Sequence, residues 1–237
     1  MALPKINSAP KYTMTIPSTG KEVGFRPFLV KEEKILMMAM ETGDQAGTLN
    51  AILETLKSCI SGEVDEKKLA AYDVEYMFLQ LRSKSVGETS TVALPCSSCK
   101  ETTPVKIQLD TIEVKKDDTV DEVVKLTDNI SIKMKYPSFH DLLGAGIDPE
   151  KMNEVDTIFK ILTRCIDGVM TDDEFHPAQD ETEEELQEFL ESLNSEQFSN
   201  VRKFVEAIPQ LKTNVEFKCE HCGIENNQEI SGIANFF

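Results

Sequence analysis

The sequence lacks a long apolar segment. Its richest apolar run, Ile35–Met40, falls far short of the roughly 20 residues that a membrane-spanning helix needs, and the charged run 31–34 directly precedes it. The first residues, Met1–Lys11, hold no apolar core of the kind found in secretory signal peptides. We therefore expect no membrane span and a location in the cytoplasm of the cell that makes the protein.

Basic residues are also scarce. The chain of 237 residues has 25 lysines and arginines against 42 acidic residues, for a formal net charge of −17. A phosphate-binding face would have to overcome this long-range repulsion, so nucleic acid is not expected to be the principal ligand. With 40% apolar residues, the chain can bury a core as one domain or as two lobes of roughly 100–120 residues each.

Catalytic motifs are missing as well. The sequence has no glycine-rich phosphate loop, no nucleophile elbow and no paired catalytic motif. His140 and His176 stand in unrelated segments, so neither provides an evident base for a thiol nucleophile at Cys59 or Cys165. We expect a protein without catalytic residues, in which Cys59 and Cys165 pack as small buried apolar side chains.

Two C-x-x-C pairs are present, and they are the most informative motif. Cys96 and Cys99 form the first pair, and Cys219 and Cys222 form the second. Four thiolates at this spacing can close a tetrahedral Zn²⁺ site, as in a split zinc ribbon. The alternatives are unrelated reduced thiols or disulfides, but a reducing compartment favours metal thiolates. Since four cysteines fill the coordination shell, we expect a structural zinc ion with no open position for water.

Each cysteine pair follows an alternating strand. Apolar side chains recur at every second residue before Cys96 and before Cys219, as half-buried strands require. Gly223 suits a tight turn after the second pair, and Lys100 after the first can offset the charge of four thiolates. His221 lies between the second pair of cysteines and is expected at the surface, because the ligand set is already complete.

The chain also repeats itself. Strand-turn-strand patterns at 12–26 and 123–135 each end at a proline, and each is followed by helix signals. The segment 49–62 aligns without gaps on 155–168, which places Cys59 on Cys165 and Gly62 on Gly168. Both segments show helical spacing, with the glycine expected as a left-handed cap. Further helices at 73–86 and 194–208 precede the cysteine hairpins, and the matching order predicts an internal duplication.

We therefore predict an α+β protein of two pseudo-symmetric halves, 1–114 and 115–237. Each half would hold a β-hairpin, helices and one zinc-knuckle hairpin, and the shared Cys₄ zinc ribbon would join the halves into one compact two-lobed unit. Loss of zinc would then loosen the contact between the lobes most of all. The linker is expected at 115–121, and two additional helix starts are expected at Asp148–Pro149 and at a capping box of Thr182 and Glu185.

Three segments are candidate partner surfaces, each with a plainer interpretation. The acidic stretch 172–185 could dock a basic partner, although charge runs are usually solvated loops or helix faces. Met37, Met38 and Met40 fit either a core or an adaptable binding surface. The C-terminal pair Phe236 and Phe237 could insert into another chain.

Two blocks outside the knuckles carry a family resemblance. The segments Arg26–Leu36 and Asp73–Gly87, with the C-x-x-C hairpin that follows, resemble the baseplate hub and hub-assembly proteins of T-even-like myoviruses. The resemblance runs nearly end to end. It implies a non-enzymatic protein made late in infection in the host cytoplasm and needed to build the tail baseplate hub. Some members of that family are hub components, and others are assembly catalysts absent from the finished particle.

The sequence thus favours a chaperone-like hub assembly factor, which would mask hub subunits transiently in the host cytoplasm. A permanent structural subunit of the hub, located in the virion baseplate, is the nearest alternative. A zinc-ribbon adaptor of a transcription or replication complex is a third, but it would need a basic strip near the knuckles. Lys100 and Lys218 are instead accompanied by four nearby acidic residues: Glu101, Glu216, Glu220 and Glu225.

Overall fold

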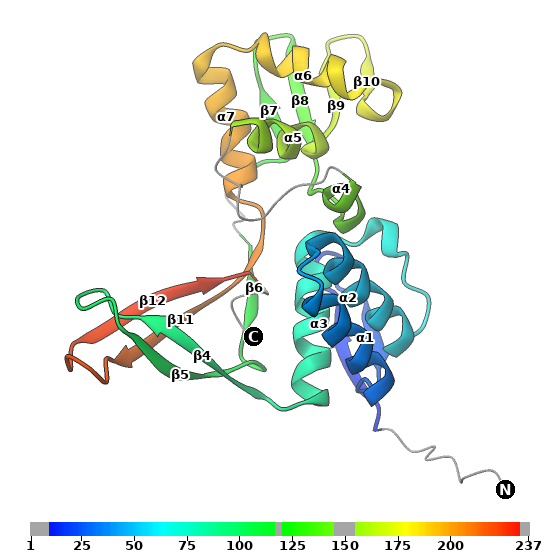
Figure 1. The fold of residues 1–237 in the computed structure, drawn as a ribbon. Coiled ribbons are helices and arrows are strands. Elements are labelled where there is room, and N and C mark those ends of the chain that lie inside the picture. Colours follow the sequence, from blue (N-terminus) through cyan, green and yellow to red (C-terminus); the bar gives the residue numbers. More distant parts are fainter. Residues whose placement is uncertain (1–9, 117–119, 145–154, 233–237) are drawn as a thin grey trace, which may run out of the picture. The chain divides into compact units, whose positions relative to one another are not determined.

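The computed structural model describes residues 10–116, 120–144 and 155–232, which combine helices with small sheets as expected of an α+β protein (Figure 1). The chain divides into two compact units. The first combines the described parts of 1–64, 72–114 and 210–237, and the second combines 65–71 with the described parts of 115–209. Each unit has its own apolar core.

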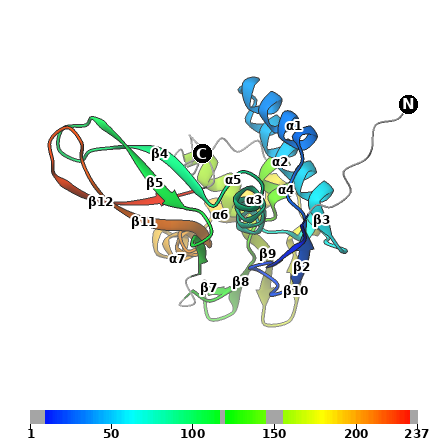
Figure 2. The same ribbon diagram turned by 90° about the horizontal axis from the view of Figure 1, so that it is seen from below.

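The first unit begins with a small sheet beside three helices (Figure 2). Strands β1 (Tyr12–Thr15) and β2 (Glu22–Phe25) form the hairpin predicted from the sequence, and β3 (Ile60–Ser61) adds to β2. The helices are α1 (Val30–Glu41), α2 (Gln45–Cys59) and α3 (Ala71–Ser85). Asp44 begins α2 by accepting a hydrogen bond from the amide of Ala46, and this bond satisfies a donor that the helix itself leaves unpaired.

Two long hairpins complete the first unit and lie side by side in Figures 1 and 2. Strand β4 (Thr89–Pro95) pairs with β5 (Thr102–Gln108), and β11 (Gln210–Lys218) pairs with β12 (Glu225–Ser231). A short strand, β6 (Glu113–Lys115), lies beside β11. The hairpins share one core, which includes Val92, Leu94, Ile107, Val215, Phe217 and Ile230.

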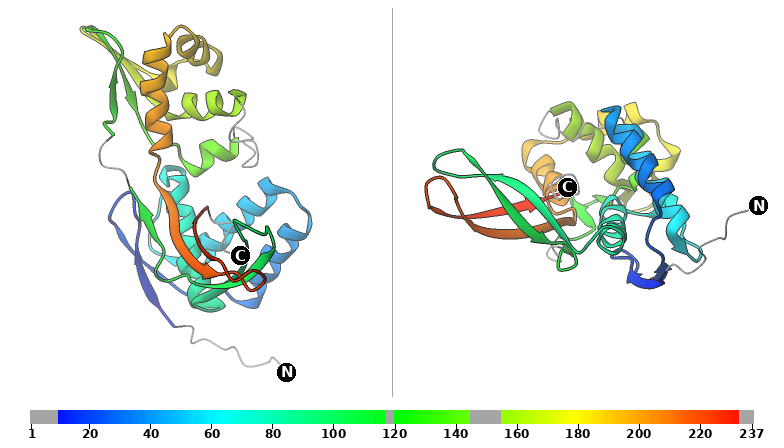
Figure 3. Two further views of the ribbon diagram at one scale, coloured as in Figure 1. Left: turned by 90° about the vertical axis from the view of Figure 1, so that its left-hand side faces the viewer. Right: turned by 60° about the horizontal axis from the view of Figure 1, so that its bottom comes forward.

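The second unit packs helices on a four-stranded sheet (Figures 1 and 3). Its strands lie in the order β10 (Phe175–Pro177), β9 (Ile166–Thr171), β8 (Ile130–Met134) and β7 (Val123–Lys125). Its helices are α4 (Phe139–Gly144), α5 (Val155–Cys165), α6 (Glu183–Glu191) and α7 (Ser195–Glu206), with short 3₁₀ turns η1 (Glu66–Lys68) and η3 (Ala178–Asp180). The core is formed by Ile132, Met134, Ile161, Leu162, Val201 and Phe204, among others.

The capping box predicted before α6 is confirmed. The amide of Glu185 donates to Thr182 Oγ1 over 3.2 Å, and the amide of Thr182 donates to Glu185 Oε2 over 2.8 Å. These reciprocal bonds pair two amides at the start of the helix. The other expected helix start, Asp148–Pro149, lies outside the described residues, as does part of the expected linker 115–121.

Matching hydrogen bonds support an internal repeat. The amide of Arg26 donates to the carbonyl of Cys59 over 3.0 Å, and the amide of Lys135 donates to the carbonyl of Cys165 over 2.7 Å. The next residue pairs in the same way in both places, with Ile60 opposite Phe25 and Ile166 opposite Met134. In both places, the residue that follows the helix pairs at once with a strand of the preceding hairpin.

The expected glycine caps are wrong. Helices α2 and α5 end at the cysteines themselves, and the following isoleucine already pairs in a sheet. Gly168 lies inside β9, where a Cβ would sit 2.5 Å from the Phe175 ring and from the carbonyl oxygen of His176. Glycine is needed there for close packing against β10, not for ending a helix.

The units also differ from the expected halves. Residue 114 is a boundary in both divisions, but the hairpin of β11 and β12 belongs to the first unit, and residues 65–71 belong to the second. The reason is burial, because the apolar faces of the two cysteine hairpins cover one another. Both cysteine pairs therefore lie in one unit.

Candidate metal centre

Each cysteine pair closes the end of one hairpin. On β4 and β11 the side chains alternate between buried and exposed, as predicted from the sequence. The alternation leaves the first cysteine of each pair in line with the buried face, so Cys96 and Cys219 are only 1% and 2% exposed. Cys99 is half-buried and Cys222 is exposed.

The two turns have the same backbone hydrogen bonds. In the first turn, the amide of Cys96 donates to the carbonyl of Glu101 over 2.8 Å, and the amide of Lys100 donates back to Cys96 over 3.1 Å. In the second turn, Cys219 donates to Ile224 over 2.9 Å and Gly223 to Cys219 over 3.0 Å. The two cysteine turns therefore have the same backbone hydrogen bonding around their thiols.

The turns bring the four sulfur atoms together. All four Sγ atoms lie within 4.8 Å of one another, and two separations between the hairpins, from Cys96 to Cys222 and from Cys99 to Cys219, are 3.6 Å. Zinc bound tetrahedrally at about 2.3 Å would place its sulfur ligands about 3.8 Å apart. The cysteines are free thiols rather than disulfides, and their spacing fits a four-thiolate metal site.

The protein environment lowers the pKa of some of the four thiols and raises that of another. The amides of Cys99 and Ser98 lower the pKa of Cys96 to about 6. The pKa of Cys219 is also lowered, chiefly by the amide of Cys222. At Cys99, the amide of Glu101 acts in the lowering direction, but burial and the neighbouring thiols outweigh it and raise the pKa to about 12. A bound cation would remove this conflict, because it stabilises all four thiolates at once.

The remaining two cysteines and the three histidines are not part of the four-sulfur cluster. Cys59 and Cys165 are 1% and 0% exposed. Burial raises the pKa of both thiols, to about 12 for Cys165. Both therefore pack as apolar side chains, as expected. The histidines at 140, 176 and 221 are all exposed, which agrees with the surface position expected for His221.

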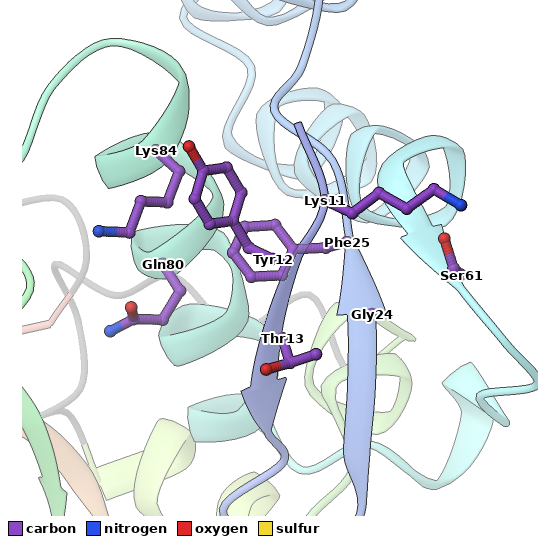
Figure 4. A pocket seen from close by; sticks show the side chains of 8 residues that line it. All are labelled: Lys11, Tyr12, Thr13, Gly24, Phe25, Ser61, Gln80 and Lys84. Carbon is purple, nitrogen blue, oxygen red and sulfur yellow. The ribbon is translucent and has the colours of Figure 1, made fainter. Parts of the chain in front are cut away.

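A pocket in the first unit lies beside β1 (Figure 4). It is lined by Lys11, Tyr12, Gln80 and Lys84, among others. Lys84 forms an ion pair with Glu88, and its Nζ lies 5.8 Å from the centre of the Tyr12 ring. The amines of Lys11 and Lys84 point in opposite directions in Figure 4, so these two groups do not converge on one ligand atom.

Of the candidate partner residues, the methionines lie in the described part of the chain, and their side chains are exposed. Met37 and Met38 are each 56% exposed on α1, while Phe236 and Phe237 lie outside the described residues. Val30 and Ile35 are also exposed on α1, although they were not among the residues predicted from the sequence. A usable signal was present, because the apolar residues of 30–40 are spread around the helix instead of following one stripe.

Comparison with known families identifies the chain. A family model described as T4 bacteriophage base plate protein matches residues 9–237. The chain belongs to this family. Comparisons with curated proteins and with solved structures give no match. As a T4-like base plate protein, the chain has other baseplate proteins of the phage as its expected neighbours, which agrees at the family level with the resemblance found in the sequence.

In this base plate protein, the segment that carried the resemblance anchors α1. Arg26 donates to Glu32 over 3.0 Å and to the carbonyl of Ser58 at the end of α2 over 3.0 Å, and Glu32 accepts the amide of Leu29 over 2.8 Å. Burial favours protonation of Glu32, but hydrogen bonds from Arg26, Leu29 and Lys31 outweigh it and lower the pKa. The ion pair between Arg26 and Glu32 thus holds the first turn of α1 in place. The same helix carries the exposed methionines of this base plate protein.

No helix in the described part of this base plate protein has both the length and the apolar composition needed to cross a membrane. The acidic stretch 172–185 contains β10, η3 and the start of α6, and two of its glutamates form side-chain bonds within the second unit. Arg164 pairs with Glu183 over 2.7 Å, and Thr182 pairs with Glu185 as described above. Part of this acidity therefore serves the fold of the second unit.

Proposed function

We propose that this baseplate-family protein is an assembly factor for the tail hub, which binds hub subunits through an apolar surface while the baseplate is built. The family match supports a baseplate protein. A chaperone-like role accounts for one further observation, the exposed apolar side chains of α1.

Helix α1 carries five large apolar side chains that are exposed. The apolar surface of α1, defined here as Val30, Ile35, Met37, Met38 and Met40, consists of side chains that are 53–78% exposed. Only Glu32 and Leu36 of this helix are buried. Exposed apolar side chains gathered on one element can mark an interaction site, and unbranched methionine side chains can adapt to more than one partner. This surface is the observation that carries the proposal.

The metal of the four-cysteine site is proposed to be zinc. Cys96, Cys99, Cys219 and Cys222 would hold it, since thiolates in a tetrahedral arrangement suit zinc. Zinc would supply charge neutralisation and a cross-link between the two hairpins. We propose no catalytic role for the chain, because four protein thiolates leave zinc no open position for a reacting water.

The charges near the knuckles bear on the adaptor hypothesis. Lys100 and Lys218 are exposed there, but so are four acidic residues: Glu101, Glu216, Glu220 and Glu225. A nucleic-acid-facing strip would need an excess of basic side chains. The local charge therefore favours a protein partner over a complex assembled on nucleic acid.

The test is quantitative mass spectrometry of the proteins captured with a tagged copy from infected cells, compared with the protein content of mature virions. Capture of hub proteins, with this chain absent from virions, is the result expected for an assembly factor. Presence of the chain in virions would make it a permanent subunit of the hub. Capture of polymerase components without any tail protein would overturn the hub proposal in favour of the zinc-ribbon adaptor.

A further inference from the structure

Two buried polar side chains next to the metal centre occupy equivalent places in the two hairpins. Thr103 lies on β5, four residues after Cys99, and Asn226 lies on β12, four residues after Cys222. They are only 3% and 6% exposed. Buried polar side chains are retained at low cost only where they find hydrogen-bond partners.

The partners of Asn226 belong mainly to the opposite hairpin. Its Oδ1 accepts from the amide of Ser97 over 2.9 Å and from Ser97 Oγ over 2.7 Å. Its Nδ2 lies 3.6 Å from Cys96 Sγ and donates to the carbonyl of Ile224 over 3.0 Å. The side chain therefore holds the first knuckle by its sulfur and by the amide that follows it.

Thr103 makes the reciprocal contact. Its Oγ1 accepts from the amide of Glu220, the residue directly after Cys219, over 3.3 Å. Glu220 follows Cys219 as Ser97 follows Cys96. Each return strand thus reaches across to the residue that follows the first cysteine of the other hairpin, and Asn226 also reaches the sulfur of Cys96.

We propose that Asn226 and Thr103 are reciprocal positioning residues for the metal centre. Each holds the residue that follows the first cysteine of the opposite hairpin, and Asn226 also contacts Cys96 Sγ, so neither knuckle has its full hydrogen-bond support until the two hairpins are paired. This inference rests on the proposed binding of zinc. Its consequence is that hairpin pairing and metal affinity are coupled, since groups that orient metal ligands commonly change affinity when removed.

The contacts predict which substitutions matter. Asn226→Ala removes both the acceptor for Ser97 and the donor toward Cys96. Thr103→Val keeps the shape of the side chain and removes its hydroxyl. Asn226→Thr installs the side chain that the equivalent position already uses. Asn227→Ala is the matched control, because Asn227 is the exposed neighbour and bonds to Glu216 over 3.3 Å, away from the cysteines.

The experiment uses the full chain with Co²⁺ as a spectroscopic probe and Zn²⁺ in competition with a chromophoric chelator. We expect Asn226→Ala and Thr103→Val each to weaken zinc affinity by about 10–100-fold and to shift the thiolate-to-cobalt absorption. Asn226→Thr should stay within about threefold of the wild type, and Asn227→Ala should bind as the wild type does.

The outcomes separate this inference from the zinc proposal. A wild type that binds one metal ion, with all four variants equal to it in affinity and spectrum, would leave the zinc site standing and overturn the positioning role. A wild type that binds neither Co²⁺ nor Zn²⁺ would overturn both. If Asn226→Ala does not fold, Thr103→Val still decides the question, because it conserves the side-chain shape and removes only the hydroxyl.

Discussion

Lys100 and Gly223 occupy the same position in the two knuckles and share a left-handed backbone, with φ angles of 64° and 75°. Each donates its amide to the first cysteine of its own turn. Lys100 is the only residue other than glycine with a positive φ in the described part of the chain. The tight turn therefore requires a left-handed backbone at this position in both knuckles. Only the second knuckle has glycine there, the residue that adopts this conformation without strain.

This relationship predicts that glycine is more stable than alanine at both positions. Lys100→Gly should be more stable than Lys100→Ala by about 1 kcal/mol, because glycine adopts the left-handed region without steric cost. Gly223→Ala should destabilise by about 1 kcal/mol. A Cβ at residue 223 would meet only Lys218, at 3.8 Å, so the loss would reflect the backbone. Chemical unfolding of the metal-loaded protein measures each difference, and equal stability of the two Lys100 variants would contradict the account.

Metal removal should act on one unit. All four cysteines belong to the first unit, so chelation should loosen β4, β5, β11 and β12 and leave the sheet of the second unit protected. Hydrogen exchange measured by mass spectrometry should show amide exchange in these hairpins faster by about 100-fold or more. Cys96→Ser should reproduce the pattern, whereas Ser98→Ala, at an exposed neighbouring position, should not. Uniform loss of protection across both units would argue against a local role.

The apolar surface of α1 predicts a binding defect without a folding defect. Replacing Met37 and Met38 together by glutamate should reduce capture of hub proteins by about tenfold or more, since two apolar anchors would become charged. Stability should change by less than about 0.5 kcal/mol because both side chains are exposed. Val86→Glu, at a position 59% exposed just beyond α3, is the control and should capture hub proteins normally. Equal capture by both variants would remove α1 from the interface.

Glu75 predicts a pH dependence of stability. Burial raises the pKa of this carboxyl from 4.5 to about 7. A raised pKa in the folded state means that stability is highest below pH 4.5 and is lost as the pH rises toward and through 7. Glu75→Gln removes the buried charge and should be more stable than the wild type by about 2 kcal/mol at pH 8, after allowance for partial solvent contact, and equal to it at pH 4.

Unfolding at the two pH values measures this difference. Glu33→Gln, at an exposed position of α1, should show no such dependence. A constant difference between Glu75→Gln and the wild type from pH 4 to pH 8 would show that Glu75 ionises in the folded protein as freely as in the unfolded chain.

The sequence by itself determined the local structure and the ligand set. Alternation predicted β4 and β11, the matched segments 49–62 and 155–168 predicted α2 and α5, and the C-x-x-C pairs predicted the cysteine cluster. These signals are local, because side-chain periodicity and turn chemistry depend on residues close together in the chain. They could not show that α2 and α5 end at cysteine, since the strand that follows each helix is fixed by pairing with a distant hairpin.

Only the tertiary structure decided which hairpins belong together. Strands β11 and β12 belong to the first unit because their apolar side chains pack against those of β4 and β5. The same pairing brings Asn226 to Cys96 and Thr103 to the amide of Glu220, contacts between residues far apart in the sequence. A threonine and an asparagine on polar return strands carry no periodic signal. Their role arises from burial and hydrogen bonding once the two hairpins have met.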